Sequence, residues 1–394
     1  MRILFVAMPD SVHTARWISQ ITDQGWDIYL FPTYIGKVHP ELSNLTVFGS
    51  LPIQKEKLGS GVHFIWWTVI FFWLDYILAK IAGIQSQKFV ENLLNIIVRR
   101  IQPDIIHSLE IQHAGYLTLI SREKLSNKFP PWIVTNWGSD IYLFGRLAAH
   151  KDKIGAVLTN CDYYSCECQR DIPLAENLGF NGTALPVLPN TGGFDIKHLV
   201  ELKSVGSSSD RRRILLKGYQ HFAGRALMGL QALRLCVEQL DGHTVTIFSA
   251  NEDVCIAAEI FQLDTHIPIE ILPVISHDEM LRMYGSSRLY IGLSISDAIS
   301  TSLLEAMVMG AFPIQSCTAC ADEWIEDGVS GFIVPPEDPV AIAEAIRQAL
   351  ADDDLVNRAA EINAQTARER LDYSIIQPQV VEMYQQIYKS SREQ

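Results

Sequence analysis

The sequence lacks an excess of positive charge. Its 394 residues include 32 Lys and Arg against 45 Asp and Glu, which gives a formal net charge of -13. A nucleic acid would therefore meet net repulsion, whereas a nucleic-acid-binding protein gains affinity by displacing counterions from the phosphates. We expect no nucleic-acid partner. The length predicts two or three domains, each large enough to bury a core.

Cysteine is scarce and shows no pairing pattern. The seven cysteines are scattered along the chain, which excludes a small disulfide-stapled protein and suits a reducing, cytoplasmic location. Cys317 and Cys320 have redox-motif spacing, but no second pair completes a zinc site. The acidic run at 352–354 follows a predicted helix at 339–350 and is interpreted as a solvated helix end. We expect no metal ion and no cofactor.

A hydrophobic run long enough to span a membrane is also missing. The most apolar segment, 64–78, is interrupted by Asp75 and is shorter than the about 20 residues that a spanning helix needs. One interpretation is a buried helix. The other is a helix in the membrane interface, which would bring the protein to the inner face of the membrane. The interfacial aromatic set would be Trp66, Trp67 and Trp73, and the wet side His63, Asp75 and Lys80.

Short apolar runs alternate with helical patterns, which is typical of parallel sheets covered on both faces. The expected strands are 3–8, 27–31, 104–106, 132–135, 163–166 and 184–188, then 214–217, 244–249, 269–272, 289–293 and 312–315. Expected helices include 14–24, 87–101 and 174–178. Turn residues at 189–195 and a polar segment at 206–210 predict the domain boundary. We therefore predict an α/β fold of two doubly wound, Rossmann-like domains that face each other across a cleft.

Open α/β sheets bind ligands at the carboxyl ends of their strands, so polar residues after strands are the candidates for chemistry. After strand 289–293 comes a polar loop, and a helix is expected near Ser302, because Ser302 and Glu305 have capping-box spacing. Free N–H groups at the helix start would bind an anion. The carboxylates of Asp297 and Glu305 can accept hydrogen bonds from sugar or ribose hydroxyls. Alternatively, Glu305 only caps its own helix and Asp297 is an ordinary loop residue.

This block carries a family resemblance. Asp297 and Glu305, followed by Gly310 and Pro313, resemble the acidic-x7-Glu motif of the retaining GT-B glycosyltransferases of family 4. Weaker matches extend it over nearly the whole chain: Asp104 to His107, Gly138 to Asp140, the segment 189–195 and a terminal helix, 373–388. The resemblance implies that the first acid contacts the donor sugar and that Glu305 holds the ribose of a nucleotide diphosphate sugar. The family more often has Glu at the position of Asp297, which leaves the sugar open.

The resemblance also implies a division of labour. Residues 1–195 would bind the acceptor, residues 196–372 the nucleotide sugar, and a C-terminal helix, 373–394, would return to the first domain. The implied donor-binding residues are Ser249, Ile299, Ser300, Thr301, Ser302, Leu303 and Glu305.

The family neutralises its diphosphate leaving group with an Arg and a Lys from the first strand and following helix of the second domain. Here Lys217 ends a predicted strand and Arg225 opens a predicted helix, so both types are present in swapped order. The pair could stabilise the leaving group without a metal ion.

Three polar loops of the first half, 8–16, 107–113 and 136–140, should bind the acceptor. Family members often carry a histidine before the glycine of the third loop, but this chain has Trp137, so that role cannot be carried over. His13 and His113 are candidate substitutes, and the alternative for each, which the sequence favours, is a hydrogen-bonded loop histidine. The catalytic candidates are thus Lys217, Arg225, Asp297 and His113, and those on the acceptor side are His13, Asn136, Trp137 and Asp140.

The implied reaction is transfer of a sugar from a nucleotide diphosphate sugar to an acceptor with retention of configuration. A saccharide or lipid-linked acceptor in cell-surface polysaccharide or glycolipid synthesis fits the aromatic segment 64–78. A nucleotide-sugar epimerase, a phosphorylase, or a non-catalytic sugar or nucleotide binder would share the fold, and these remain alternatives.

Overall fold

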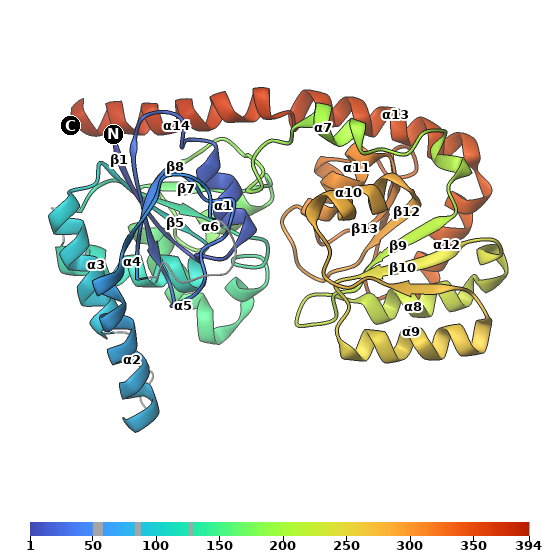
Figure 1. Ribbon diagram of the computed structural model, residues 1–394, viewed down its shortest axis with the longest axis horizontal. Coiled ribbons are helices and arrows are strands. Elements are labelled where there is room, and N and C mark those ends of the chain that lie inside the picture. Colours follow the sequence, from blue (N-terminus) through green and yellow to red (C-terminus); the bar gives the residue numbers. More distant parts are fainter. Residues whose placement is uncertain (50–57, 83–87, 126–128, 394) are drawn as a thin grey trace. The chain divides into compact units, whose positions relative to one another are not determined.

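A computed structural model describes residues 1–49, 58–82, 88–125 and 129–393 of the chain (Figure 1). It divides the chain into two compact units, Met1–Gly192 with Ile376–Gln394, and Gly193–Ile375. Each unit contains one sheet, of eight and six strands respectively. The strand pairings of the described residues are all parallel. The predicted α/β architecture with two parallel sheets is therefore confirmed.

The first sheet has the order β4-β3-β2-β1-β5-β6-β7-β8. Its strands are β1 (Arg2–Ala7), β2 (Asp27–Pro32), β3 (Leu45–Phe48), β4 (Val62–Ile65), β5 (Ile105–Leu109), β6 (Trp132–Thr135), β7 (Tyr163–Ser165) and β8 (Thr183–Ala184). Helices α1 (Val12–Ser19), α2 (Val69–Ala82), α3 (Lys88–Ile101), α4 (Tyr116–Leu125), α5 (Ala148–Asn160) and α6 (Asp171–Asn177) connect them. The central strand β1 is buried from Ile3 to Ala7, which explains its unbroken apolar sequence.

Several predicted boundaries were wrong. The helix expected over 64–78 begins later, because Phe64 and Ile65 pair with β3 as the end of β4 and a single 3-10 turn, Trp66–Thr68, precedes α2. Strands β3 and β4 were missed altogether. The strand expected at 184–188 is only the two-residue β8. The helix expected from residue 87 is α3, and Gln87 lies outside the described residues.

Helix α2 exposes most of its apolar side chains, although Val69 and Phe72 are buried, and it buries its acidic side chain. Asp75 was expected on a wet face, yet it is 6% exposed and its carboxylate accepts the N–H groups of Phe89 and Val90 at 3.3 and 2.9 Å. The carboxylate thereby caps the start of α3, whose first N–H groups have no partner within their own helix. None of the described helices is long and apolar enough to cross a bilayer.

The last helix, α14 (Tyr373–Glu393), packs into the core of the first unit. The expected return of the C-terminal helix to the first domain is therefore confirmed. Both chain ends lie in this unit (Figure 1). Trp17 donates its indole N–H to the Tyr384 hydroxyl at 2.9 Å, and that oxygen lies 2.6 Å from Nδ1 of His107. Nε2 of His107 lies 2.6 Å from the Thr135 hydroxyl.

One assignment of protons gives every group in this chain of hydrogen bonds a partner. Tyr384, which accepts from Trp17, donates its own proton to Nδ1 of His107, and Nε2–H of His107 donates to Thr135. The imidazole is then neutral. Burial, which lowers the pKa of His107 to about 3, favours the same state.

The second sheet has the order β11-β10-β9-β12-β13-β14, which is the order of a Rossmann sheet. Its strands are β9 (Arg213–Lys217), β10 (Thr244–Phe248), β11 (Ile269–Ile271), β12 (Ser287–Gly292), β13 (Phe312–Ser316) and β14 (Phe332–Val334), the last of which was not predicted. Its helices are α7 (Ile196–Glu201), α8 (Ala226–Leu235), α9 (Glu252–Thr265), α10 (His277–Gly285), α11 (Thr301–Met309), α12 (Pro339–Ala351) and α13 (Asp353–Arg370). Strand order reverses between β9 and β12, so a crevice opens where their carboxyl ends diverge.

Candidate functional site

Lys217 occupies the crevice of the second unit. It ends β9, and its Nζ donates to the Ser300 hydroxyl at 3.2 Å, which ties the end of β9 to the loop after β12. Nζ also lies 4.7 Å from the centre of the Tyr219 ring. Burial alone would lower the pKa of Lys217, but Tyr290, Asp297, Tyr219 and Glu305 together outweigh it and raise the pKa. A cation is therefore held where the sheet favours an anionic ligand.

The turn after β9 is packed so closely that it requires glycine. A Cβ added to Gly218 would lie 2.8 Å from both the Phe248 carbonyl oxygen and the Ala250 Cα. These two residues flank Ser249, an exposed residue with a φ of 56°, a conformation uncommon outside glycine. The ends of β9 and β10 thus approach each other backbone to backbone, and Ser249 lies at that junction.

Arg225 stands at the N-cap position of α8, as the sequence predicted for a helix start. Its Nε donates to the Glu337 carboxylate at 2.8 Å, and one terminal nitrogen donates to the Gly224 carbonyl at 2.9 Å. Glu337 was not among the predicted site residues. Its carboxylate is a competitor for any anion that Arg225 binds.

His221 lies between Lys217 and Arg225 in sequence. Its Nδ1 accepts the N–H of Ala223 at 3.1 Å, and a backbone N–H can only donate, so the proton of the neutral ring is on Nε2. Burial and then the charges of Lys217 and Arg225 lower the pKa of His221. The turn therefore carries two cations and a neutral imidazole donor.

The predicted capping box at the start of α11 was wrong. The helix begins at Thr301 with Ser300 as N-cap, and the Ser300 side chain makes no capping bond. Glu305 contacts a different helix. Glu305 is 5% exposed. Its carboxylate lies 2.7 Å from Nε2 of His277, the first residue of α10. The alternative in which Glu305 only caps its own helix is excluded.

The remaining donor-side candidates surround this helix start. Asp297 is half-buried in the loop after β12 and accepts the N–H of Ala298 at 3.0 Å. Ser302, half-buried like Thr301, follows in the first turn of α11. The side chains of Ile299 and Leu303 belong to the buried core, so they can offer a ligand only main-chain groups. The N–H of Leu303 is already bonded to the Ser300 carbonyl.

In the first unit, the loop after β5 is strained at Glu110. This residue has φ 84° and ψ 157°, a region populated almost only by glycine. Its buried carboxylate accepts the N–H groups of His113 and Ala114, both at 2.6 Å, and lies 3.3 Å from the His113 ring. The hydrogen bond to Glu110 raises the pKa of His113, against the opposing effect of burial.

The loop after β6 meets the same segment. The buried Asp140 carboxylate accepts the N–H groups of Ile111 and Trp137, both at 2.9 Å. Burial and then the charge of Glu110 raise the pKa of Asp140 well above its usual range, although these two N–H donors oppose the shift. The predicted loops at 107–113 and 136–140 are thus brought together.

His13 and Asn136 complete the predicted acceptor side. The His13 ring, in α1, packs edge-on against Trp137 with 5.5 Å between ring centres. Asn136 is fully buried and donates to the Asp171 carboxylate at 2.6 Å, while its carbonyl accepts from the Asn190 side chain at 3.1 Å. Asn136 therefore supports this loop, whereas Trp137 and His113 keep part of their surface exposed.

The sequence analysis missed four residues at these sites, namely Glu110, Asp171, His277 and Glu337. The capping-box spacing of Ser276 and Glu279, which the structure contains, could have located the start of α10 and hence His277. No local signal indicates that His277 meets Glu305, since 28 positions separate them.

Parts of both units match models of known families. Residues 231–366, from the second half of α8 to most of α13, match the family model described as glycosyl transferases group 1. Residues 80–164 match the model described as glycosyl transferase 4-like. The two matches together cover more than half of the chain. A search of curated proteins found no relative with significant sequence similarity.

Solved structures share the fold at low sequence identity. Sucrose-phosphate synthase from Thermosynechococcus elongatus superposes with a TM-score of 0.70 at 14% identity, covering 99% of this chain and 100% of that one. HepE from Anabaena, solved in complex with UDP, gives a TM-score of 0.68 at 14% identity over 98% and 100% of the two chains. A glycosyltransferase from Rickettsia africae gives 0.66 at 14% identity over 98% of each chain.

Proposed function

Because the chain belongs to the group 1 glycosyl transferases, retaining GT-B enzymes that take a sugar from a nucleotide sugar, we propose that it transfers a hexosyl group to a lipid-linked saccharide. The observation that carries the donor half is the cluster in the second unit, where Lys217, Ser300 and Glu305 surround the crevice between β9 and β12.

Different residues would bind the charged diphosphate of the donor and its uncharged ribose and sugar rings. Lys217 and Arg225 provide positive charge for the diphosphate, and Arg225 exchanges Glu337 for phosphate oxygens. Glu305 accepts hydrogen bonds from ribose hydroxyls, with His277 fixing the orientation of its carboxylate. Asp297 and the main chain of 299–303 lie beside the sugar, and Ser249 lies at the neighbouring strand end.

The transfer breaks the bond between the anomeric carbon and the diphosphate oxygen and forms a bond from the same carbon to the acceptor hydroxyl oxygen, whose proton passes to the departing phosphate oxygen. The new bond forms on the face from which the diphosphate departs, through an oxocarbenium-like transition state, so the configuration is retained. Negative charge develops on the leaving phosphate, and Lys217 and Arg225 stabilise it there. With two cations at this position the reaction proceeds without a metal ion.

The first unit would receive the acceptor. His113, His13, Asn136, Trp137 and Asp140 lie in the loops after its strands or in α1 beside them. The lipid part of the acceptor is supported by α2, which projects from this unit in Figure 1 and carries exposed aromatic residues. An aromatic and aliphatic helix face of this kind lies in the membrane interface, here at the inner face of the membrane.

A donor panel tests the reaction. UDP-glucose is the first donor to test, because HepE, a protein of this fold, was solved in complex with it. Release of nucleotide that depends on an added lipid-linked saccharide, and that persists in EDTA, supports the proposal. Conversion of the donor without acceptor would indicate an epimerase, dependence on inorganic phosphate a phosphorylase, and binding without turnover a non-catalytic protein.

Liposome flotation tests the membrane half. With a net charge of -13, binding to lipid must be mainly hydrophobic, so the protein should float with vesicles almost equally at low and high salt. A chain that stays in the soluble fraction at every salt concentration would favour a soluble acceptor.

A further inference from the structure

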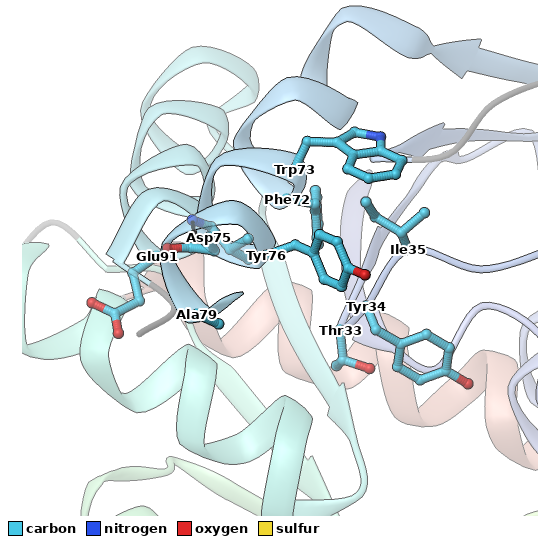
Figure 2. Close-up of a pocket in the computed structure, with 10 residues that line it drawn as sticks. Thr33, Tyr34, Ile35, Phe72, Trp73, Asp75, Tyr76, Ala79 and Glu91 are labelled. Atoms are coloured by element: carbon cyan, nitrogen blue, oxygen red, sulfur yellow. Dashed lines mark hydrogen bonds between the residues drawn. The ribbon is translucent and has the colours of Figure 1, made fainter. Parts of the chain in front are cut away.

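A pocket opens on one side of α2, in the first unit (Figure 2). Tyr34, which lines it, donates a hydrogen bond to Asp10 of the loop 8–16, so the pocket adjoins the proposed acceptor side. Its volume is about 730 Å³, within the range of pockets that hold small organic ligands. Residues from α2, from α3 and from the segment after β2 line it. Figure 2 shows the rings of Trp73 and Tyr76 directed from α2 toward Ile35 and Tyr34.

The carboxylates at the pocket are already engaged. Asp75 caps the start of α3 through the N–H groups of Phe89 and Val90. Glu91 pairs with Lys124 at 3.2 Å. Neither carboxylate needs a cation from a ligand. Besides the hydroxyl groups of Thr33 and Tyr34, the pocket offers the apolar surface of Phe72, Trp73, Tyr76 and Ala79.

The pocket is continuous with the outer face of α2. Trp73 and Tyr76 both line the pocket, yet each remains 48% exposed, so they form its rim. Beyond the rim the exposed apolar surface continues over Trp66, Trp67, Ile70 and Ile81. The two rim residues thus link the apolar part of the pocket lining to this exposed part of α2.

We propose that this pocket binds the hydrocarbon chain of a lipid, drawn from the membrane on which the outer face of α2 lies. The proposal rests on the proposed function, in which the acceptor is lipid-linked, and it names the part of the acceptor that this unit binds.

The aromatic composition favours a lipid over a protein partner. The outer face presents three indole rings and a phenol ring, side chains that are enriched where hydrocarbon meets water. Lys80, whose Nζ lies 5.0 Å from the centre of the Tyr76 ring, places its charge beside the rim, where a long lysine side chain can reach the headgroup layer. A hydrocarbon chain needs no hydrogen-bonding partners, which matches a pocket whose carboxylates are engaged.

Calorimetric titration with the n-alkanols octanol, decanol and dodecanol tests the pocket without a membrane and without turnover. Each added methylene that is buried should raise affinity about fourfold, so each step of two carbons should raise it about 15-fold. Binding should also show a negative heat-capacity change. Affinity that does not increase with chain length would overturn the proposal, whatever the variants do.

Two variants separate the pocket from the outer face. Ala79→Phe fills the pocket and should weaken dodecanol binding at least tenfold while liposome flotation is kept. Trp66→Ser/Trp67→Ser/Ile70→Ser changes only the outer face and should lose flotation while dodecanol binding is kept. Ala149→Phe, the same substitution at an exposed position of α5 outside the pocket, is the matched control.

The opposite pattern, with Ala79→Phe binding dodecanol like the wild type, would overturn the pocket assignment. Concentration-dependent self-association of the wild type that dodecanol does not compete would do the same, because it would assign the surface to a protein partner. Failure of the glycosyltransferase reaction is a separate result, since neither alkanol binding nor flotation requires a donor or turnover.

Discussion

The two units place opposite charges at the same position in similar sheets. In the first, the loops after β5 and β6 and the start of α6 bring the buried carboxyl groups of Glu110, Asp140 and Asp171 to the strand ends. In the second, the corresponding position holds Lys217 and Arg225 with the hydroxyl of Ser300. The comparison teaches that sheet topology selects where a ligand binds, while the side chains after the strands select its charge.

This contrast supports the proposed division between acceptor and donor. A diphosphate would meet the buried carboxyl groups of Glu110, Asp140 and Asp171 at the edge of the first sheet, and Lys217 and Arg225 at the edge of the second. Neutral hydroxyl groups of a saccharide suit the first edge better, because carboxylates and amides accept and donate hydrogen bonds to them.

The largest expected effect comes from removing the cation Lys217 at the strand ends of the second sheet. Lys217→Met should lower kcat/KM for the donor by about 100- to 1000-fold, since in the proposed reaction Lys217 stabilises the charge that develops on the leaving phosphate. Steady-state kinetics with saturating acceptor measures it, and Lys197→Met, an exposed lysine of α7, is the control. A fall in kcat/KM of less than tenfold would contradict the proposal that the cations at these strand ends act on the diphosphate.

The second prediction distinguishes Glu305 from Asp297, the two acidic residues on the donor side of the second unit. Glu305→Ala should weaken nucleotide binding by about 10- to 100-fold, because a buried charged acceptor of hydroxyl groups is lost. Asp297→Asn should change nucleotide affinity less than threefold and act mainly on kcat, since it lies on the sugar side. Calorimetry with UDP decides, and unchanged affinity in the Glu305 variant would contradict the assignment.

The third prediction concerns pH and the first unit. His107 has a pKa of about 3 when folded and an ordinary value of 6.5 when unfolded. Between these values the unfolded chain binds a proton that the folded chain does not. The free energy of unfolding should therefore fall by up to about 1.4 kcal/mol for each pH unit below 6.5.

Urea unfolding followed by tryptophan fluorescence between pH 7 and pH 5 measures this dependence. The His107→Gln variant should be less stable at pH 7 but should lose less stability on acidification. Parallel pH profiles for the two proteins would show that other groups carry the dependence.

The smallest expected effect concerns Asp140, one of the buried carboxyl groups at the strand ends of the first sheet. Asp140→Asn should raise the free energy of unfolding at pH 7 by about 1 kcal/mol, because the raised pKa of Asp140 means that a charged carboxylate is disfavoured in its buried site. The asparagine oxygen can still accept the N–H groups of Ile111 and Trp137. The same urea titration checks this, and a destabilised variant would show that the first edge depends on a carboxylate.

The fold could be predicted from the sequence wherever a strand is fully buried. Runs such as Ile3 to Ala7 are apolar throughout, so they are recognisable without structural context. Strands β3 and β4 are four residues long and include Thr46 and His63, so their composition does not differ from that of a loop. They are strands because β2 offers an edge to β3, and β3 in turn offers one to β4, which is a tertiary cause.

The sequence indicates where the candidate site residues lie along the fold better than it indicates which residues they contact. Lys217, Asp297 and Glu305 follow strands of the sheet, and strand ends can be read from hydrophobic runs. The partner of Glu305 could not be predicted, because His277 comes from another helix. Asp75 shows the same limit, since helical periodicity cannot reveal that the open start of α3 lies beside it.

The position of Tyr384 in the first core has a consequence for biosynthesis. Ribosomes make the chain from its N-terminus, so Trp17 and His107 emerge long before the residue that completes their hydrogen bonds. At about 5 to 20 residues per second, roughly 10 to 40 s separate the end of the first segment at Gly192 from the C-terminus. The second unit, which is continuous in sequence, can finish folding in that interval. The first unit, although it is translated first, reaches its native core last.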